Sequence, residues 1–298
     1  MKVAVDKDSE GDKVSYRMSM DTIAGRISFD QKAYFEKEGR EYRLKWDDSL
    51  IFPDMEFTDK VRVTKLKGNR GAIYDRNGKM LAGKGKAASV GLVPGKIKDR
   101  KASVSGLAKL LGVKKEDIDK KLDASWVTKD SFVPVKKMTP VQEAKIEKKL
   151  LKISGVLVSS EDSRVYPYGK KASHLTGYVQ EISAEELEKK KDQGYEQGQL
   201  VGKSGLEVLY EDRLHETDGY KISILNEDGR EKKVLAVKRE KNGEDIYTTI
   251  DAGLQEKIYD QYKGDKSCSV MMNPKTGEVL ALVSTPAYDS NDLSLIHI

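Results

Sequence analysis

The chain of 298 residues lacks what several classes of protein require. Its only cysteine is Cys268, which excludes a disulfide framework and a cysteine-based metal site. The three histidines are scattered without metal-ligand spacing, and we predict no cofactor and no metal. The longest apolar run, 279–283, is much shorter than the roughly 20 residues of a membrane-spanning helix. Because charged residues follow Met1 at once, we predict that Met1 does not open a signal peptide, and we expect a soluble polypeptide.

Charge is abundant but nearly balanced, with 54 basic and 49 acidic residues and a formal net charge of +5. Lysines gather in 145–152 and 189–191, where each run includes or adjoins glutamate on a helix-like segment. Such runs favour solvated helix faces over a nucleic-acid surface, so we predict no nucleic-acid partner. The alternative, a basic nucleic-acid-binding protein, would be retained on DNA in a salt-dependent way. Cys268 precedes three apolar residues, which predicts a buried strand position.

The first 55 residues alternate apolar and polar side chains, as β-strands do. In the segment 41–47, Tyr42, Leu44 and Trp46 fall on one face. These strands need a partner layer, and the segment is too short to supply a complete one. We therefore expect the end of a domain whose beginning lies elsewhere, with a boundary at Pro53.

Strand and helix signals alternate from residue 56 to about 245. Asn77-Gly78 predicts a hairpin with a type I′ turn, and Asp228-Gly229 predicts a second hairpin. Capping boxes predict helix starts at Thr139, Ser183 and Ser204. The last of these helices shows one apolar stripe, closed by a glycine; its residues are Leu206, Leu209, Tyr210, Leu214 and Gly219.

The final part of the sequence predicts a strand, a helix and a hairpin. The strand covers 245–250, and Asp251 caps a helix over 252–262. Pro274 and Gly277 bracket a tight turn. Because the strand 279–283 is apolar on both faces, we predict that it is central in a sheet. The expected fold class is α+β, with several domains.

Four motifs follow one another in this sequence. Residues 70–78 read R-G-A-I-Y-D-R-N-G, and residues 164–169 read R-V-Y-P-Y-G, followed by Ala172, His174, Gly177 and Tyr178. Residues 202–207 read G-K-S-G-L-E, and 249–255 read T-I-D-A-G-L-Q. Together with P-K-T-G-E-V-L-A-L-V-S-T-P-A-Y-D at 274–289, they resemble a class B penicillin-binding protein. The resemblance carries motif roles to Arg70, Gly71, Asp75, Arg76, Gly78, Arg164, Pro167, Gly169, His174, Gly177, Gly205, Glu207 and Asp251.

The resemblance implies a domain order. Residues 1–55 would be the C-terminal part of an NTF2-like domain, of the low-affinity methicillin-resistance type. Residues 56–244 would form the dimerisation (pedestal) domain, and 245–292 the start of a truncated transpeptidase (β-lactamase-like) domain. We expect 293–298 to be a non-native tail, since a sequencing adapter would encode this hexapeptide. The chain would then be truncated at both ends.

The resemblance also implies function and place. The full-length protein would be a serine D,D-transpeptidase on the extracytoplasmic face of the cell membrane, tethered by a missing N-terminal helix. Its partners would be peptidoglycan stem peptides, β-lactams and proteins of cell-wall synthesis or division.

The catalytic motifs of such an enzyme are missing here. No serine has lysine three positions later, so S-x-x-K is absent. Two sequences match K-[ST]-G, at 203–205 and 275–277, but both precede the place of the nucleophile. The P-loop-like segment 198–204 is one residue too short. We therefore predict no catalytic residue in this chain and an inactive fragment; S-x-x-K, S-x-N and the catalytic K-[ST]-G would lie beyond its C-terminus.

The charged motif residues have a structural interpretation. Arg70, Asp75, Arg76 and Glu207 would form buried arginine–carboxylate pairs that orient two lobes, without contacting a substrate. His174 would pack or hydrogen-bond before the turn at Gly177. The rival hypothesis is a free-standing, non-catalytic pedestal that docks proteins of the cell-wall machinery.

Overall fold

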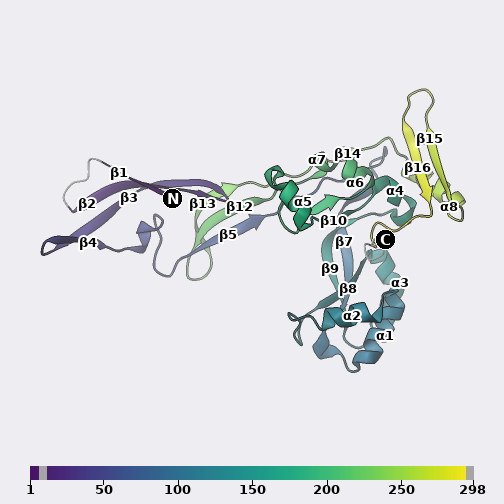
Figure 1. Ribbon diagram of the computed structural model, residues 1–298, viewed down its shortest axis with the longest axis horizontal. Coiled ribbons are helices and arrows are strands. Elements are labelled where there is room, and N and C mark those ends of the chain that lie inside the picture. Colours follow the sequence, from purple (N-terminus) through teal and green to yellow (C-terminus); the bar gives the residue numbers. More distant parts are fainter. Residues whose placement is uncertain (7–11, 293–298) are drawn as a thin grey trace. The chain divides into compact units, whose positions relative to one another are not determined.

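The computed structural model describes residues 1–6 and 12–292, and these form two compact units (Figure 1). Unit 1 comprises residues 1–69 and 216–242, and unit 2 comprises 70–215 and the described residues from 243 onward. The α+β, multidomain layout is confirmed. The expected tail at 293–298 lies outside the described residues. Within the described residues, no helix combines the length and apolarity needed to cross a membrane.

Unit 1 contains two antiparallel sheets. The first has the strand order β1-β2-β3-β4, and the second the order β13-β12-β5. A short 3-10 helix, η1 (Asp48–Leu50), follows the first sheet. The core of this unit includes Ile27, Phe52, Ile222 and Ile224. The strands are β1 (Lys2–Val5), β2 (Lys13–Thr22), β3 (Gly25–Glu38), β4 (Glu41–Lys45), β5 (Lys60–Leu66), β12 (Gly219–Leu225) and β13 (Glu231–Lys238).

The main sheet of unit 2 is built around the long strand β7. Its order is β14-β6-β7-β8, and β9 also pairs with β7. Glycines at positions 83, 85 and 91 of β7 meet neighbouring atoms so closely that a Cβ would clash. The strands are β6 (Ile73–Tyr74), β7 (Met80–Leu92), β8 (Val133–Met138), β9 (Val156–Val165) and β14 (Ile246–Tyr247).

Helices cover one end of this sheet, while short elements lie beside the other. The helices α1, α2 and α3 pack on β7, β8 and β9 around Val90, Leu92 and Leu107. The strands β10 (Val179–Glu181) and β11 (Leu200–Gly202) form a separate antiparallel pair. The helices are α1 (Arg100–Leu111), α2 (Lys115–Leu122), α3 (Pro140–Leu150), α4 (Ser173–Thr176), α5 (Ala184–Lys189), α6 (Gly205–Leu209) and α7 (Glu211–Leu214), with 3-10 turns η2 (Pro94–Lys96), η3 (Gly169–Lys171) and η4 (Lys191–Gln193).

The last elements of unit 2 are a helix and a hairpin. Helix α8 (Ala252–Tyr262) is capped by the Asp251 side chain, as predicted, and packs on β16 (Val279–Thr285). The predicted turn before β16 is confirmed, with Gly277 at φ +75°. The prediction that β16 is central is wrong, since among the described residues it pairs only with β15 (Ser267–Met272). Only alternate side chains of β16 are buried, because one face packs on α8 and the other does not.

Cys268 is exposed, and the prediction of a buried position is wrong. It lies on β15, as expected, but that strand has no second neighbour among the described residues. The apolar side chains of Val270, Met271 and Met272 on the same strand are exposed as well. Local apolar sequence predicted a strand correctly, whereas burial depends on a covering layer that these elements do not supply.

The capping boxes at Thr139 and Ser183 are confirmed, but the one at Ser204 is wrong. Ser204 makes no side-chain cap, and its hydroxyl lies 3.4 Å from that of Tyr288; the Glu207 side chain, which would complete the box, binds buried arginines instead. The predicted helix is broken into α6 and α7 at Tyr210, so its apolar stripe is interrupted and Leu209 is exposed. Gly219 begins β12 and does not close the helix.

Both predicted hairpins form, β6–β7 and β12–β13. The type I′ turn predicted at Asn77-Gly78 is wrong, because only Gly78 has positive φ, at +77°. The Asp75 carboxylate accepts the backbone N–H groups of Asn77 and Lys79, both at 2.8 Å. These bonds hold Asn77 with negative φ and leave the left-handed conformation to the glycine.

Candidate functional site

Four charged side chains meet inside unit 2, and we call them the buried ion cluster. They are Arg70, just before β6; Arg164, on β9; Glu207, on α6; and Glu211, on α7. Their side chains are at most 7% exposed. The shortest contacts join Arg70 to Glu207 at 2.9 Å, Arg70 to Glu211 at 2.6 Å and Arg164 to Glu207 at 2.7 Å. The predicted pairing of Arg70 with a buried carboxylate is present.

Hydrogen bonds fix the orientation of both carboxylates. Glu207 Oε1 accepts from Arg164 Nε and from the Tyr166 hydroxyl at 3.1 Å, and Oε2 accepts from Arg70. Glu211 accepts from Arg70, from the Tyr195 hydroxyl at 2.6 Å and from the backbone N–H of Gly202 at 2.8 Å. Every carboxylate oxygen of the cluster therefore accepts a hydrogen bond, as burial of charge demands.

The pKa shifts in the cluster favour permanent charge. Burial alone would lower the pKa of Arg70, but Glu211 and Glu207 outweigh it and raise that pKa. Burial would raise the pKa of Glu211, yet hydrogen bonds and the charge of Arg70 bring it below its ordinary value. Burial, followed by the charge of Glu207, raises the pKa of the Tyr166 phenol well above its usual range. Groups held this far from neutral pH cannot exchange protons readily, so the cluster is suited to holding segments together.

Two motif glycines allow the chain to approach this cluster closely. A Cβ on Gly71 would lie 2.0 Å from the carbonyl oxygen of Glu244. Gly177 has φ +72° and ψ −149°, and a Cβ there would lie 1.8 Å from the carbonyl oxygen of Ser204. Only glycine fits either position, which explains these motif residues by contact between backbones.

Asp75 connects the first hairpin of unit 2 to helix α8. Its Oδ2 accepts the backbone N–H of Ala252 at 3.1 Å, and the N–H of Arg76 donates to Ile250 O at 2.8 Å. Burial would raise the Asp75 pKa, but the backbone N–H groups outweigh burial and lower it. The predicted arginine pair for Asp75 is wrong, since its partners are amides. Arg76 is 38% exposed and lies 3.6 Å from Glu278.

Gln255 adds a second connection in the same region. This buried side chain of α8 donates to the carbonyl oxygens of Lys171 and Leu282 and accepts the N–H of Leu282 at 2.8 Å. Helix α8 and strand β16 are thereby tied to the turn η3, which motif residue Gly169 begins. Pro167 lies in the exposed turn between β9 and η3.

Residues 286–292, which we call the strap, run from β16 back along unit 2. His174 Nε2 lies 3.0 Å from the carbonyl oxygen of Pro286, and the ring of His174 meets that of Tyr288 edge to face. The hydrogen bond and the ring contact are of the kind that the sequence predicted for His174. Tyr288 donates to Ser173 O at 3.0 Å. Gly177 lies beside this contact, at the end of α4.

The strap ends on the main sheet. Asn291 accepts the backbone N–H of Tyr166 at 2.9 Å and donates to its carbonyl oxygen at 2.8 Å. Lys136 on β8 pairs with Asp292 at 2.7 Å, and Gln142 donates to Asp289 at 3.0 Å. These bonds span 125 to 156 positions of sequence, so only the tertiary fold brings them together.

The two K-[ST]-G sequences occupy different elements. Lys203 pairs with Glu186, and Gly205 begins α6. Lys275-Thr276-Gly277 forms the hairpin turn, where the Thr276 hydroxyl donates to Glu278 at 3.1 Å. The Lys203 ammonium and the Thr276 hydroxyl thus each contact a glutamate of unit 2. The absence of catalytic residues from this chain remains a prediction based on sequence.

Sequence reasoning missed several members of the site: Tyr166, Tyr195, Glu211, Asn291 and Asp292. A signal for Glu211 was present, because two glutamates four residues apart on a helical segment repel unless a cation lies between them. The two tyrosines and the strap residues gave no such local signal. Arg70, Arg164 and Glu207 are brought together, whereas Arg76, Pro167 and His174 lie apart from the cluster.

Comparisons with known proteins identify the family of this chain. The model of the "Penicillin-binding Protein dimerisation domain" matches residues 65–248, and that of the "NTF2-like N-terminal transpeptidase domain" matches 1–59. The chain is 43% identical over 296 residues to "Penicillin-binding protein 3" of Bacillus subtilis strain 168, covering 96% of this chain and 44% of that protein. It is 33% identical over 239 residues to "Peptidoglycan D,D-transpeptidase MrdA" of Escherichia coli K12, covering 78% and 38%.

A solved structure resembles the chain as well. The complex between penicillin-binding protein PBP2 and MreC from Helicobacter pylori matches with a TM-score of 0.51 and 25% identity, covering 78% of this chain and 44% of that one. The chain thus spans less than half the length of these relatives. The two family matches and the relatives show that this chain belongs to the class B penicillin-binding proteins, with an NTF2-like segment before a dimerisation domain.

Proposed function

We propose that this chain is the non-catalytic part of a peptidoglycan D,D-transpeptidase. The names of the relatives support the transpeptidase activity of the whole protein. The match to the dimerisation domain supports the assignment of this chain to its non-catalytic part. In the whole enzyme a serine would attack the penultimate D-alanine carbonyl of a stem peptide and release the terminal D-alanine. The acyl group would then pass to an amine of a neighbouring strand, and β-lactams would trap the same serine. The enzyme would work at the extracytoplasmic face of the cell membrane.

The observation that carries the proposal is the attachment of the C-terminal elements to the rest of unit 2. Asp75 and Gln255 fix α8 and β16, and the strap adds Asn291 and Asp292. These are the elements that resemble the entry to a transpeptidase domain. A catalytic domain continuing from them would be held in a fixed orientation on the pedestal. We place its start at residue 245, after a pedestal at 56–244 and an NTF2-like end at 1–55, of the methicillin-resistance type.

The 298 residues by themselves should not react with penicillin, because S-x-x-K is missing. The test is incubation with a fluorescent penicillin, followed by denaturing electrophoresis, with the Bacillus subtilis relative as the labelled control. Circular dichroism would confirm that the chain is folded. Fluorescence that stays on this chain after denaturation would contradict the prediction.

A second candidate function is a pedestal that docks a partner of the cell-wall machinery. It is favoured by the resemblance to the PBP2 chain that was solved in complex with MreC. Titration of this chain with the MreC protein of the same organism, followed by calorimetry, would test it. Binding by this chain would support docking, whereas binding only by a longer, catalytic form would contradict a free-standing module.

A further inference from the structure

Strand β5 of unit 1 is an open edge of its sheet (Figure 1). The order β13-β12-β5 places it at one end, and among the described residues β5 pairs only with β12. An edge strand presents unpaired backbone N–H and C=O groups on its outer side, and an extended peptide can bind them as a further strand. Residues 60–63 of β5 also line a hollow of about 400 Å³, together with Leu225, Asn226, Glu227 and Gly229.

One face of β5 carries apolar side chains that unit 1 leaves largely uncovered. Val61 lies opposite Ile224 and Val63 opposite Ile222 in the register of the strand pair. Both isoleucines are buried in the core of unit 1, whereas Val61 and Val63 are 41% and 56% exposed. Because cross-strand neighbours share a face of the sheet, the covered core extends as far as β12 and stops short of β5. An added strand with apolar side chains on this face would cover both valines.

The other face of β5 carries two cations without counter-charges. Lys60 and Arg62 alternate with the valines, both are exposed, and neither forms an ion pair within the described residues. Asp59, directly before the strand, is already paired with Lys232 at 2.9 Å. Glu227 is the acidic residue that lines the hollow, so the lining keeps a net positive charge. The unmatched demand on this face is therefore for carboxylates, which bind lysine and arginine through charge-assisted hydrogen bonds.

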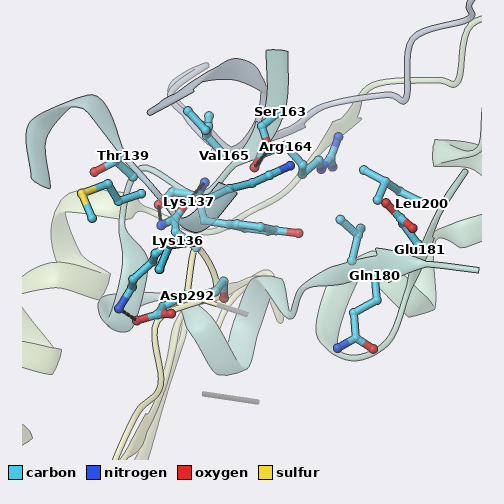
Figure 2. A pocket seen from close by; sticks show the side chains of 17 residues that line it. Lys136, Lys137, Thr139, Ser163, Arg164, Val165, Gln180, Glu181, Leu200 and Asp292 are labelled. Carbon is cyan, nitrogen blue, oxygen red and sulfur yellow. Dashed lines mark hydrogen bonds and ion pairs between the residues drawn. The ribbon is translucent and has the colours of Figure 1, made fainter. Parts of the chain in front are cut away.

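Lysines that line the cavity of unit 2 show the contrast (Figure 2). Lys136 pairs with Asp292 at 2.7 Å, as the dashed line in Figure 2 shows, and Lys137 pairs with Glu161 at 2.8 Å. Lys60 and Arg62 lack such pairs among the residues that the structure describes, so their charges are available to a partner.

We propose that the β5 edge binds an extended segment of another protein in which acidic and β-branched apolar residues alternate. The carboxylates would lie on the face of Lys60 and Arg62, the apolar side chains would cover Val61 and Val63, and the segment would extend the sheet by one strand. A second copy of β5 fits less well, because it would bring its own cations to the edge, and like charges across a strand pair are destabilising. The site belongs to unit 1 and does not depend on the proposed transpeptidase function.

The test uses two fluorescein-labelled peptides, one alternating glutamate with valine and the other alternating lysine with valine, and follows binding by fluorescence polarisation. The glutamate peptide should bind about tenfold more tightly, because opposite charges replace like charges across the strand pair. It should also slow hydrogen exchange of residues 60–66. Equal binding of the two peptides, or binding of neither, would overturn the proposal. A dimer in analytical ultracentrifugation that excludes the peptide would assign the edge to a second copy and would overturn it too.

Charge-reversal variants locate the site. The double variant Lys60→Glu/Arg62→Glu should reverse the preference, so that the lysine peptide binds more tightly. Arg40→Glu/Lys45→Glu is the matched control, because it makes the same charge change at exposed positions of the other sheet of unit 1 and should keep the original preference. If the first variant fails to fold, Lys60→Gln/Arg62→Gln should bring the two peptides to equal affinity. An unchanged preference in the β5 variants, or a reversed one in the control, would refute the site.

Discussion

Replacing Glu207 with glutamine removes one negative charge from the buried ion cluster while keeping the size of the side chain. The original cluster holds two arginines and two glutamates, so its charges cancel. Glu207 uses one oxygen for Arg164 and Tyr166 and the other for Arg70. A glutamine amide has only one oxygen, so its NH₂ group must face an arginine N–H on one side.

The expected cost follows from this geometry. Removing one partner of a buried ion pair costs about 3–5 kcal/mol, because the other charge is left uncompensated. Since glutamine keeps the size of the side chain but also sets two donors against each other, we expect about 4 kcal/mol, the middle of that range. For a unit of roughly 200 residues, this corresponds to a fall in Tm of about 8–16 °C.

The assay is thermal unfolding of the original chain and the variant, combined with hydrogen exchange of peptides from α6 and α7. Exchange localises the effect, because a chain with two compact units need not unfold in one step. Glu188→Gln is the matched control, since that side chain is 79% exposed and should change stability by at most about 0.5 kcal/mol. A Glu207 variant as stable as this control would refute the reasoning.

Three further predictions concern other contacts in unit 2. Gly177→Ala should unfold much of the unit at 37 °C, as measured by circular dichroism, because its Cβ would lie 1.8 Å from a carbonyl oxygen. Gly78→Ala, at φ +77° with open space around it, should lower the free energy of unfolding by only about 1–2 kcal/mol. Lys203 and the capping bonds lower the Glu186 pKa to about 2 from its ordinary 4.5, so this stabilisation is present above pH 4.5 and is lost as pH falls toward 2. Glu186→Gln should flatten the Tm-versus-pH curve in that window, and an unchanged curve would contradict the assignment. Asn291→Ala should cost about 1–3 kcal/mol and speed hydrogen exchange of the strap; unchanged exchange would show that the strap does not depend on it.

Local sequence signals predicted local structure well where the partners are neighbours in the chain. The capping boxes at Thr139 and Ser183 and the cap at Asp251 form as predicted, because each bond closes within three residues. At Ser204 both side chains of the predicted box instead contact residues far away in the sequence: the Ser204 hydroxyl lies 3.4 Å from that of Tyr288, and Glu207 pairs with Arg70 and Arg164. Two buried arginines bind Glu207 more strongly than a neutral cap bond could.

The burial of side chains was harder to predict than the positions of the strands. Cys268 lies on the expected strand, but its exposure depends on whether another element covers that face. The same holds for β16, whose apolar sequence indicated two covered faces. Apolar side chains show that a strand can be buried on a given face, but whether that face is buried depends on which other elements pack on it.

The sequence alone determined the family, the α+β class and both hairpins, since motifs and turn residues act over short spans. Only the tertiary structure showed that Glu211 and the two tyrosines complete the buried ion cluster. It alone placed Asn291 beside Tyr166. These contacts join residues from 16 to 141 positions apart, and they leave no periodicity in the sequence because their geometry exists only once the strands and helices have packed.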